Sequence, residues 1–313
     1  MRVRACGVCG TDLHLHDLGL YAPGVTPGHE IAGEVDALGP GVEGLAPGDP
    51  VVVEPLHSCG ACRACREGRD AICPDGAIYG LNRDGGFAEH ALVPARRVFR
   101  APADLPMAVA ALAEPLAVAI HGLRRGGFEA GQRILVLGAG PVGLATVAAA
   151  RFLGAGPVWA SARYPHQAER ARRLGAARVL GEAEAAPAAL GRLPEAERPD
   201  LVMETVGGHA DTLGAAVAAL RPGGVISVLG LFMQDVALPS FPLVRKEVTL
   251  AWSNCYVHTR EHADFEDAVA LLDAERERLA SLATHSVPLD EIPRAYALAA
   301  DKRSGVIKVT VQP

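Results

Sequence analysis

Four of the seven cysteines in the chain stand close together, at Cys59, Cys62, Cys65 and Cys73. The spacing C-x2-C-x2-C-x7-C lets four sulfurs converge on one tetrahedral zinc ion, which takes thiolates at about 2.3 Å. An iron–sulfur cluster is one alternative, because the bacterial ferredoxin run also opens C-x2-C-x2-C and ends in Cys-Pro, but its last spacing is x3. Unligated surface thiols are another. The pattern favours a closed, structural zinc site that takes no part in chemistry.

A second set of possible metal ligands lies in the runs G-V-C-G-T-D-L-H at 7–14 and G-H-E at 28–30. If Cys9 and His29 share an ion with a carboxylate, either Glu30 or Glu114, one position stays open for water or substrate, as a catalytic zinc site requires. Two plainer interpretations remain, since His29 could be an ordinary turn histidine and Cys6-x2-Cys9 a redox pair. Glu114 stands at the junction where the β-rich part of the sequence gives way to alternating strands and helices. Because ligands favour clefts between domains, this position makes Glu114 a candidate ligand.

A glycine-rich turn follows the apolar run at 134–137, with Gly138, Gly140 and Gly143 in the pattern G-x-G-x-x-G. A strand before this motif and a helix after it make a dinucleotide site, with the pyrophosphate at the helix N-terminus. Free N–H groups and the helix dipole favour an anion there. We therefore expect this turn, including Pro141 and Val142, to hold a nicotinamide dinucleotide.

About 20 residues after the glycines, a site that prefers NAD presents Asp or Glu to the ribose 2′-hydroxyl. Here that position is Ala162, and Arg163 follows it. A guanidinium can bind a 2′-phosphate in a fork, whereas a carboxylate would repel it. We expect NADP, bound by Arg163 with Ser161 as a secondary partner. The alternative is that Arg163 is a solvated surface residue and that NAD is also accepted.

These residues need elements to position them, and the sequence predicts two kinds. The first third reads as β-rich, with apolar runs such as 51–53 and 91–93 between turn residues. From about Pro115, apolar strands alternate with helices, which is typical of a parallel sheet covered on both faces. We expect strands at 134–137, 158–161, 201–205, 225–229, 247–252 and 306–311, and helices at 142–153, 165–174, 210–220, 261–272 and 292–300.

The predicted fold class is therefore α/β, with a doubly wound Rossmann sheet and a β-rich catalytic domain. We place the catalytic domain and its zinc lobe at 1–118 and the dinucleotide-binding domain at 119–255. Residues 256–313 return to the catalytic domain. The length of 313 residues suffices for two domains with a sizeable core.

Composition and charge argue against nucleic acid or a membrane as the partner of this chain. The chain has 30 Lys and Arg against 36 Asp and Glu, a formal charge of −6, with no long block of like charge that would suggest nucleic acid or a membrane surface. Its longest uncharged apolar stretch, 134–150, is shorter than the roughly 20 residues that a membrane span needs, and no signal peptide opens the chain. We expect a cytoplasmic protein with a small-molecule substrate.

Taken together, the sequence resembles the medium-chain zinc-dependent alcohol dehydrogenases over essentially its whole length. The motifs that carry the resemblance are G-V-C-G-T-D-L-H, G-H-E, the four-cysteine run, D-G-G-F-A-E at 84–89 and G-A-G-P-V-G at 138–143. The segment E-P-L-A-V-A-I-H at 114–121 is similar to the polyol, butanediol and threonine dehydrogenase branches. These carry Glu or Asp where simple alcohol dehydrogenases have Cys.

The resemblance implies a role for each residue of the first motif. Zinc would be held by Cys9 and His29, with Glu30 or Glu114 completing the set directly or through water. Asp12 would fix the ring of His29, as carboxylates behind metal histidines do. Thr11 would hydrogen-bond the substrate hydroxyl, and His14 would continue a proton relay to solvent. Zinc would act as a Lewis acid on an alcohol or carbonyl substrate, and the nicotinamide would exchange the hydride.

Three further expectations come from the resemblance. The family has strands before the G-x-C-G-T-D turn, which here begins six residues in, so we expect an N-terminally shortened β-domain of the GroES-like kind or a start at an internal methionine. We expect a homo-oligomer, a dimer or tetramer. The competing functional hypothesis is a catalytically impaired, zinc-stabilised NADPH-binding protein, which the intact set of Cys9, Thr11, His14, His29 and Glu30 disfavours.

Overall fold

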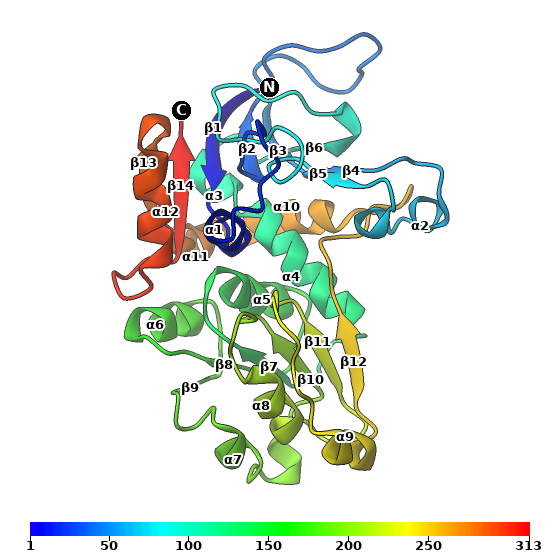
Figure 1. The fold of residues 1–313 in the computed structure, drawn as a ribbon, viewed down its shortest axis with the longest axis vertical. Coiled ribbons are helices and arrows are strands. Elements are labelled where there is room, and N and C mark those ends of the chain that lie inside the picture. The colour runs from blue at the N-terminus through cyan, green and yellow to red at the C-terminus, as the bar shows by residue number, and fades with distance from the viewer. The chain divides into compact units, whose positions relative to one another are not determined.

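The computed structural model describes every residue from 1 to 313, and the chain divides into two compact units. Met1–Ala117 and Tyr256–Pro313 form the first unit, and Val118–Cys255 form the second. Figure 1 labels the elements of both. The predicted combination of a β-rich domain with a Rossmann-type domain is confirmed, and each unit has its own sheet.

The first unit is built on a six-stranded sheet in the order β13-β14-β1-β2-β3-β6. Its strands are β1 (Arg2–Gly7), β2 (Glu30–Glu34), β3 (Pro50–Val53), β6 (Val98–Arg100), β13 (Ala283–Pro288) and β14 (Lys308–Gln312). In this register Gly7 lies opposite Glu30 on one side and Thr310 on the other. The chain that leaves β1 therefore starts between the first residue of β2 and the middle of β14.

Short helices surround this sheet, and apolar side chains fill its core. The helices are α1 (Gly10–Asp17), α2 (Arg63–Arg66), α3 (Met107–Ala110), α4 (Ala113–Arg125), α10 (Asp264–Ala274), α11 (Arg276–Leu279) and α12 (Ile292–Ala300), and α4 continues into the second unit. A separate pair of strands, β4 (Leu56–His57) and β5 (Ala77–Ile78), flanks the cysteine run. Val3, Ile31, Val287 and Val309 are at most 1% exposed, which buries the inner face of the sheet.

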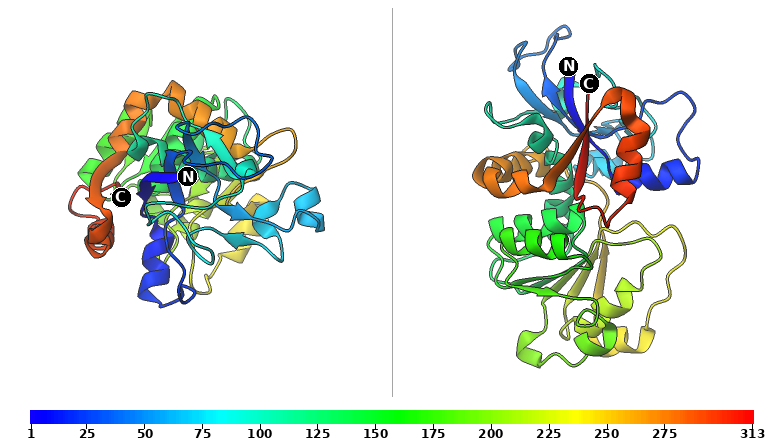
Figure 2. Two further views of the ribbon diagram at one scale, coloured as in Figure 1. Left: turned by 90° about the horizontal axis from the view of Figure 1, so that it is seen from above. Right: turned by 90° about the vertical axis from the view of Figure 1, so that its left-hand side faces the viewer.

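The second unit has a wholly parallel sheet in the order β12-β11-β10-β7-β8-β9. Its strands are β7 (Ile134–Leu137), β8 (Val158–Ser161), β9 (Arg178–Leu180), β10 (Leu201–Glu204), β11 (Val225–Val228) and β12 (Thr249–Trp252). Its further helices are α5 (Pro141–Phe152), α6 (Pro165–Arg173), α7 (Pro187–Leu190), α8 (Thr212–Ala219) and α9 (Ser240–Lys246). Helices lie on both faces of this sheet, α5 with α6 on one and α7 with α8 on the other (Figure 2). This is the doubly wound arrangement that the alternating pattern predicted.

Several predicted elements were wrong or displaced. Residues 91–93 form no strand, because the backbone of this stretch pairs only at Ala91, with Met1, and Leu92 is 92% exposed. The helix expected from 261 begins at Asp264, where the Glu266 side chain accepts from the N–H of Ala263. The strand expected from 247 begins at Thr249, since Glu247 takes a left-handed conformation that ends α9. Sequence periodicity missed β9, β13 and α4.

One stretch, Met107–Arg125, is long and apolar enough to cross a membrane by length and composition alone. Most of it, 78%, is buried inside the fold. Leu116, Ile120 and Leu123 have no exposed surface. Met107–Arg125 is therefore buried to the extent that is typical of a helical segment in a protein core.

Candidate metal centres and dinucleotide site

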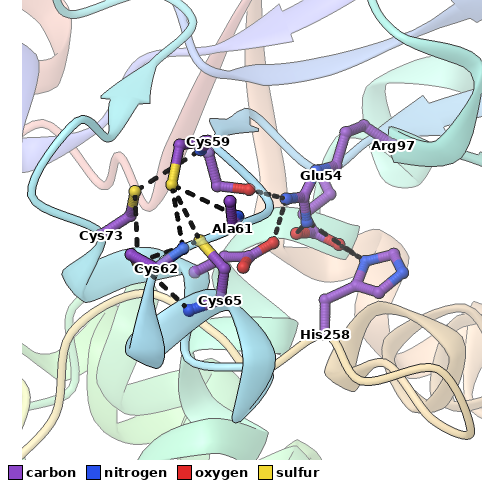
Figure 3. A network of polar contacts seen from close by, with 10 residues as sticks. Glu54, Cys59, Ala61, Cys62, Cys65, Cys73, Arg97 and His258 are labelled. Carbon is purple, nitrogen blue, oxygen red and sulfur yellow. Dashed lines mark hydrogen bonds and ion pairs between the residues drawn. The ribbon is translucent and has the colours of Figure 1, made fainter.

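The four clustered cysteines point toward one another (Figure 3). Their sulfur atoms all lie within 4.8 Å of one another. Cys62 Sγ is 3.4 Å from Cys65 Sγ and 3.9 Å from Cys73 Sγ, and Cys59 Sγ is 3.9 Å from Cys65 Sγ. Tetrahedral zinc–sulfur bonds of about 2.3 Å place sulfurs about 3.8 Å apart. The set therefore fits one zinc ion.

Backbone N–H groups prepare these sulfurs for a metal. Those of Ala61 and Cys62 donate to Cys59 Sγ at 3.4 and 3.3 Å, and that of Cys65 donates to Cys62 Sγ at 3.5 Å. The two bonds from Ala61 and Cys62 lower the pKa of the Cys59 thiol to about 7. Since the thiolate is the form that binds metal, the turn geometry itself favours binding.

A buried arginine anchors this lobe to the sheet. Arg97 is 1% exposed, and its guanidinium binds the carboxylates of Glu54 and Asp70 and donates to Ser58 Oγ at 3.0 Å. Ser58 directly precedes the first cysteine, and Asp70 lies in the turn before the last. His258 Nδ1 lies 2.6 Å from Glu54 Oε2, which adds the returning C-terminal segment to the network (Figure 3).

The second ligand set also converges. Cys9 is the N-cap of α1, His29 precedes β2 and Glu30 is its first residue. One ligand atom from each lies within 4.8 Å of the others. This follows from the register, because β1 delivers the chain to Cys9 directly opposite the start of β2. His29 and Glu30 are 5% and 1% exposed, whereas Cys9 is half-buried.

The carboxylate of Asp12 lies behind this set and is completely buried. Its Oδ2 accepts the Cys9 N–H at 2.8 Å, and its Oδ1 is 3.5 Å from His29 Nδ1. Burial alone would lower the pKa of His29, but the Asp12 carboxylate and the Cys9 sulfur outweigh it and raise that pKa. The negative charges of Asp12 and Cys9, which favour a proton on the His29 imidazole, also favour a metal cation beside it.

Glu30 and Glu114 are held in different ways. Glu30 Oε1 accepts from Lys308 Nζ at 2.5 Å, while its buried Oε2 has no hydrogen-bond partner. A Cβ at Gly7 would collide with the Glu30 carboxylate, so any larger residue there would displace this carboxylate. Glu114 Oε1 accepts the hydroxyl of Tyr256. Burial raises the pKa of Glu114 to about 7, and the nearby Glu30 adds to the shift.

These donor sets fit zinc. A thiolate, an imidazole with one ring nitrogen turned toward a carboxylate and a buried, unpartnered carboxylate oxygen are hard to reconcile with a plain structural core, because each would be costly to bury alone. The same groups are suitable ligands for a zinc ion with an open position. Cys6, by contrast, is a fully buried thiol packed beneath Gly28 and Gly86.

The glycine-rich turn lies between β7 and α5, as predicted. Gly138 has φ +99°, and a Cβ at Gly143 would collide with the Gly138 carbonyl oxygen, so both positions need glycine. Gly140 is the N-cap of α5, which starts at Pro141 and Val142. Ser161 Oγ accepts the Gly138 N–H at 2.9 Å, and this contact makes Ser161 a support of the turn.

Arg163 follows β8 and is largely exposed. Its Nε lies 3.1 Å from Glu182 Oε1, and its guanidinium lies over the Tyr164 ring. The sequence did not point to Glu182, whose carboxylate competes with any anion for this arginine. Thr11 Oγ1 lies 3.7 Å from Cys9 Sγ, and His14, one turn further along α1, is half-buried.

Four more residues contact the two metal sites or the side chains that support them, and none was singled out from the sequence. They are Lys308, Tyr256, Arg97 and Tyr21. Lys308 could not have been found from the sequence pattern, because the alternating run I-K-V-T-V places it on the face opposite the apolar side chains, where a solvated lysine is expected. In the structure Lys308 is buried. The others are single polar residues far along the chain from most of their partners.

Two protein families match parts of this chain, and several characterised proteins are similar to it. Residues 1–103 match the alcohol dehydrogenase GroES-like domain family, and residues 141–274 match the zinc-binding dehydrogenase family. L-threonine 3-dehydrogenase of Thermococcus kodakarensis is 37% identical over 244 residues, 76% of this chain and 69% of the relative. Sorbitol dehydrogenase of Bacillus subtilis is 32% identical over 321 residues, 100% of this chain and 89% of the relative.

Solved structures show the same fold. Galactitol-1-phosphate dehydrogenase from Escherichia coli has a TM-score of 0.90 at 30% identity, and the match covers 100% of this chain and 91% of that one. A Sinorhizobium meliloti protein, provisionally described as a zinc-binding dehydrogenase and solved with NADP bound, has a TM-score of 0.85 at 32% identity, with the same coverage.

Proposed function

Because the chain belongs to the medium-chain zinc-dependent alcohol dehydrogenases, which are NAD(P)-linked oxidoreductases, we propose that it oxidises a secondary alcohol of a polyol or hydroxy-amino acid and prefers NADP. The observation that carries the proposal is the convergence of Cys9, His29 and Glu30 on one point, with Asp12 behind them. When bound there, zinc supplies Lewis-acid chemistry at the alcohol oxygen.

Three residues of the chain would hold that ion, and two more would support them. Cys9 and His29 would supply two ligands and Glu30 the third, because Glu30 joins the convergent set and keeps one oxygen unpartnered. Glu114 would lie behind it, held by Tyr256. Asp12 Oδ1 lies 3.5 Å from His29 Nδ1, which would leave the other ring nitrogen to ligate the ion.

Thr11 and His14 would handle the proton. The Thr11 hydroxyl lies close to the Cys9 sulfur, where it can accept a hydrogen bond from a substrate alcohol. His14, half-buried on the same helix, can carry the proton toward solvent. A histidine suits this task because its charge changes near neutral pH.

The dinucleotide would bind at the glycine-rich turn. The N-terminus of α5 offers Gly140, Pro141 and Val142 to the pyrophosphate, and the missing Cβ at Gly140, where the space is open, would let it approach closely. Preference for NADP rests on Ala162 in place of a carboxylate and on Arg163. Because Glu182 pairs with Arg163 and competes with a 2′-phosphate for it, NAD would also be accepted.

The relatives suggest where to look for the substrate. One relative is named for L-threonine and another for sorbitol, and both names describe substrates with a secondary alcohol. The deciding experiment is an assay of the zinc-loaded protein against threonine, polyols, vicinal diols and simple secondary alcohols, each with NADP and NAD. Reduction of NADP by one of these classes supports the proposal. Failure of every class with both cofactors, in a protein that holds zinc, would overturn it.

We also propose that the chain acts in the cytoplasm as a homo-oligomer. All seven cysteines are free of disulfides, which suits a reducing compartment. Phe241, Val244 and Trp252 in the second unit expose 72%, 76% and 50% of their surface, an apolar set that a second copy could cover. Light scattering of the purified protein tests the oligomeric state, and a monomeric mass at assay concentration would contradict it.

A further inference from the structure

We propose that Tyr21 is a positioning residue for the open metal site and that it acts through Asp12 on Cys9 and His29 together. The inference rests on the proposed function, because it assumes that Cys9 and His29 hold the catalytic ion. Tyr21 hydrogen-bonds to Asp12 and Tyr296 rather than to either ligand, and it belongs to none of the motifs in the sequence.

The Asp12 carboxylate is the common support of both ligands. Its Oδ2 fixes the backbone of Cys9 at 2.8 Å, and its Oδ1 faces His29 Nδ1 at 3.5 Å. The first contact is an ordinary hydrogen bond, whereas the second is an ion-pair distance too long for a hydrogen bond. The orientation of the His29 ring therefore depends on how firmly Oδ1 is held in place.

Tyr21 supplies that hold. Its hydroxyl donates to Asp12 Oδ1 at 2.7 Å, the same oxygen that faces His29. A hydroxyl bonded to a carboxylate makes one of the stronger hydrogen bonds in proteins, and here the acceptor is fully buried. The contact fixes the plane of the carboxylate, since Oδ2 is already bound to the backbone.

The ring of Tyr21 is placed by the surrounding fold. Its neighbours Leu18 and Leu20 are 55% and 56% exposed, so Tyr21 turns inward from an otherwise exposed segment. Its hydroxyl lies 3.3 Å from the hydroxyl of Tyr296 on α12. Tyr296 in turn packs edge-on against Phe87. The Tyr21 hydroxyl thus connects the segment after α1, through Asp12, to Cys9 and His29.

Two tyrosines give a matched pair for the test. Tyr21→Phe and Tyr296→Phe each remove one hydroxyl from this hydrogen-bonded pair, but only Tyr21 hydrogen-bonds to Asp12. The cysteine site serves as an internal control in the same molecule. Removing the direct partner of a metal-binding histidine typically costs about 10- to 100-fold in metal affinity or activity. Tyr21 contacts the histidine's partner and not the histidine itself. For Tyr21→Phe we therefore expect a loss of metal affinity of about tenfold, the lower end of that range.

The measurement is zinc release from the full-length protein to a chromogenic chelator, followed as two kinetic phases. Tyr21→Phe should speed loss of the open-site ion about tenfold and leave the cysteine-site ion unchanged, while Tyr296→Phe stays within about twofold of the parent. Cobalt substituted at the open site should show a shifted visible spectrum in Tyr21→Phe. Equal acceleration of both ions, or no acceleration of either, would overturn the inference.

A double variant distinguishes action through Asp12 from a separate effect. In an Asp12→Asn background, Tyr21→Phe should change the release rate of the open-site ion by less than about twofold, because their shared path is already weakened. A full further increase of about tenfold would contradict the inference while leaving the metal site intact. A parent protein that binds only one zinc, at the cysteines, would instead refute the proposed function and this inference with it.

Discussion

Lys308 Nζ lies 2.5 Å from Glu30 Oε1, and both side chains are almost completely buried. The lysine also donates to the carbonyl of Val8 at 3.2 Å, so it joins β14 to the chain just before Cys9. A buried charge that loses its partner typically costs about 3–5 kcal/mol. This ion pair therefore fixes the Glu30 carboxylate, the proposed third ligand, beside Cys9 and His29.

The first prediction concerns this pair. In protein stripped of the open-site metal, Lys308→Met should lower the free energy of unfolding by about 3–5 kcal/mol, because it leaves the Glu30 carboxylate unpaired in the core. Glu30→Gln in the same chain should restore part of the loss. Urea denaturation at neutral pH measures both. If the double variant were as unstable as the sum of the singles, the two residues would not act as a pair.

A second prediction follows from Glu114. Its folded pKa of about 7 lies above its ordinary value of 4.5, chiefly through burial, so the folded protein holds a proton that the unfolded chain releases. Stability from this group is complete below about pH 4.5 and is lost as pH rises to about 7, a change of about 3 kcal/mol in protein stripped of the open-site metal.

Glu114→Gln tests it, since glutamine keeps an acceptor for Tyr256 and cannot ionise. Unfolding free energies of the parent and the variant should converge near pH 4.5 and diverge toward pH 7, with the variant more stable there. Parallel curves across this range would show that Glu114 does not titrate as described.

A third prediction concerns the lobe held by Arg97. Arg97→Met should speed zinc loss from the four cysteines, because Ser58 and Asp70 lose their common partner and two carboxylates remain buried without a cation. The exposed ion pair of Arg63 and Glu67 in the same lobe provides a control, since its removal should change little. Chelator kinetics of Arg97→Met and Arg63→Ala would separate the two effects. Equal rates would exclude a special role for Arg97.

The fourth prediction tests cofactor choice. Arg163→Ala should raise the KM for NADP about tenfold or more and leave that for NAD nearly unchanged, since a charge-assisted hydrogen bond is worth about 1.5–3 kcal/mol. Glu182→Gln should lower the KM for NADP, because it frees the guanidinium from its present partner. A parent enzyme with the higher kcat/KM for NAD would contradict the assignment of Arg163.

The parts of the fold and of the candidate sites that could be predicted are those whose residues lie near one another in the sequence. The four cysteines and the turn from Gly138 to Gly143 were found because short spacings fix their geometry. The parallel sheet was found because its strands are apolar runs between helices. Contacts such as Lys308 with Glu30 join residues nearly the whole chain apart, and only the strand register of the folded sheet brings them together.

The failures have physical causes as well. The apolar run at 91–93 resembles a strand, but a strand needs a ladder partner, and Leu92 lies almost fully exposed instead. The sequence also did not indicate that Arg163 pairs with Glu182, which lies just after the neighbouring strand β9, so the role of Arg163 in cofactor binding stays a prediction.

The central claim is that one chain holds two different metal sites, closed at the cysteines and open at Cys9 and His29. Elemental analysis of the parent, Cys9→Ser and Cys62→Ser proteins tests it most directly. We predict two zinc ions per chain in the parent and one in each variant. Cys9→Ser should keep its fold and lose activity, while Cys62→Ser should lose thermal stability. Two zinc ions retained in Cys9→Ser, or a single ion in the active parent, would contradict the claim.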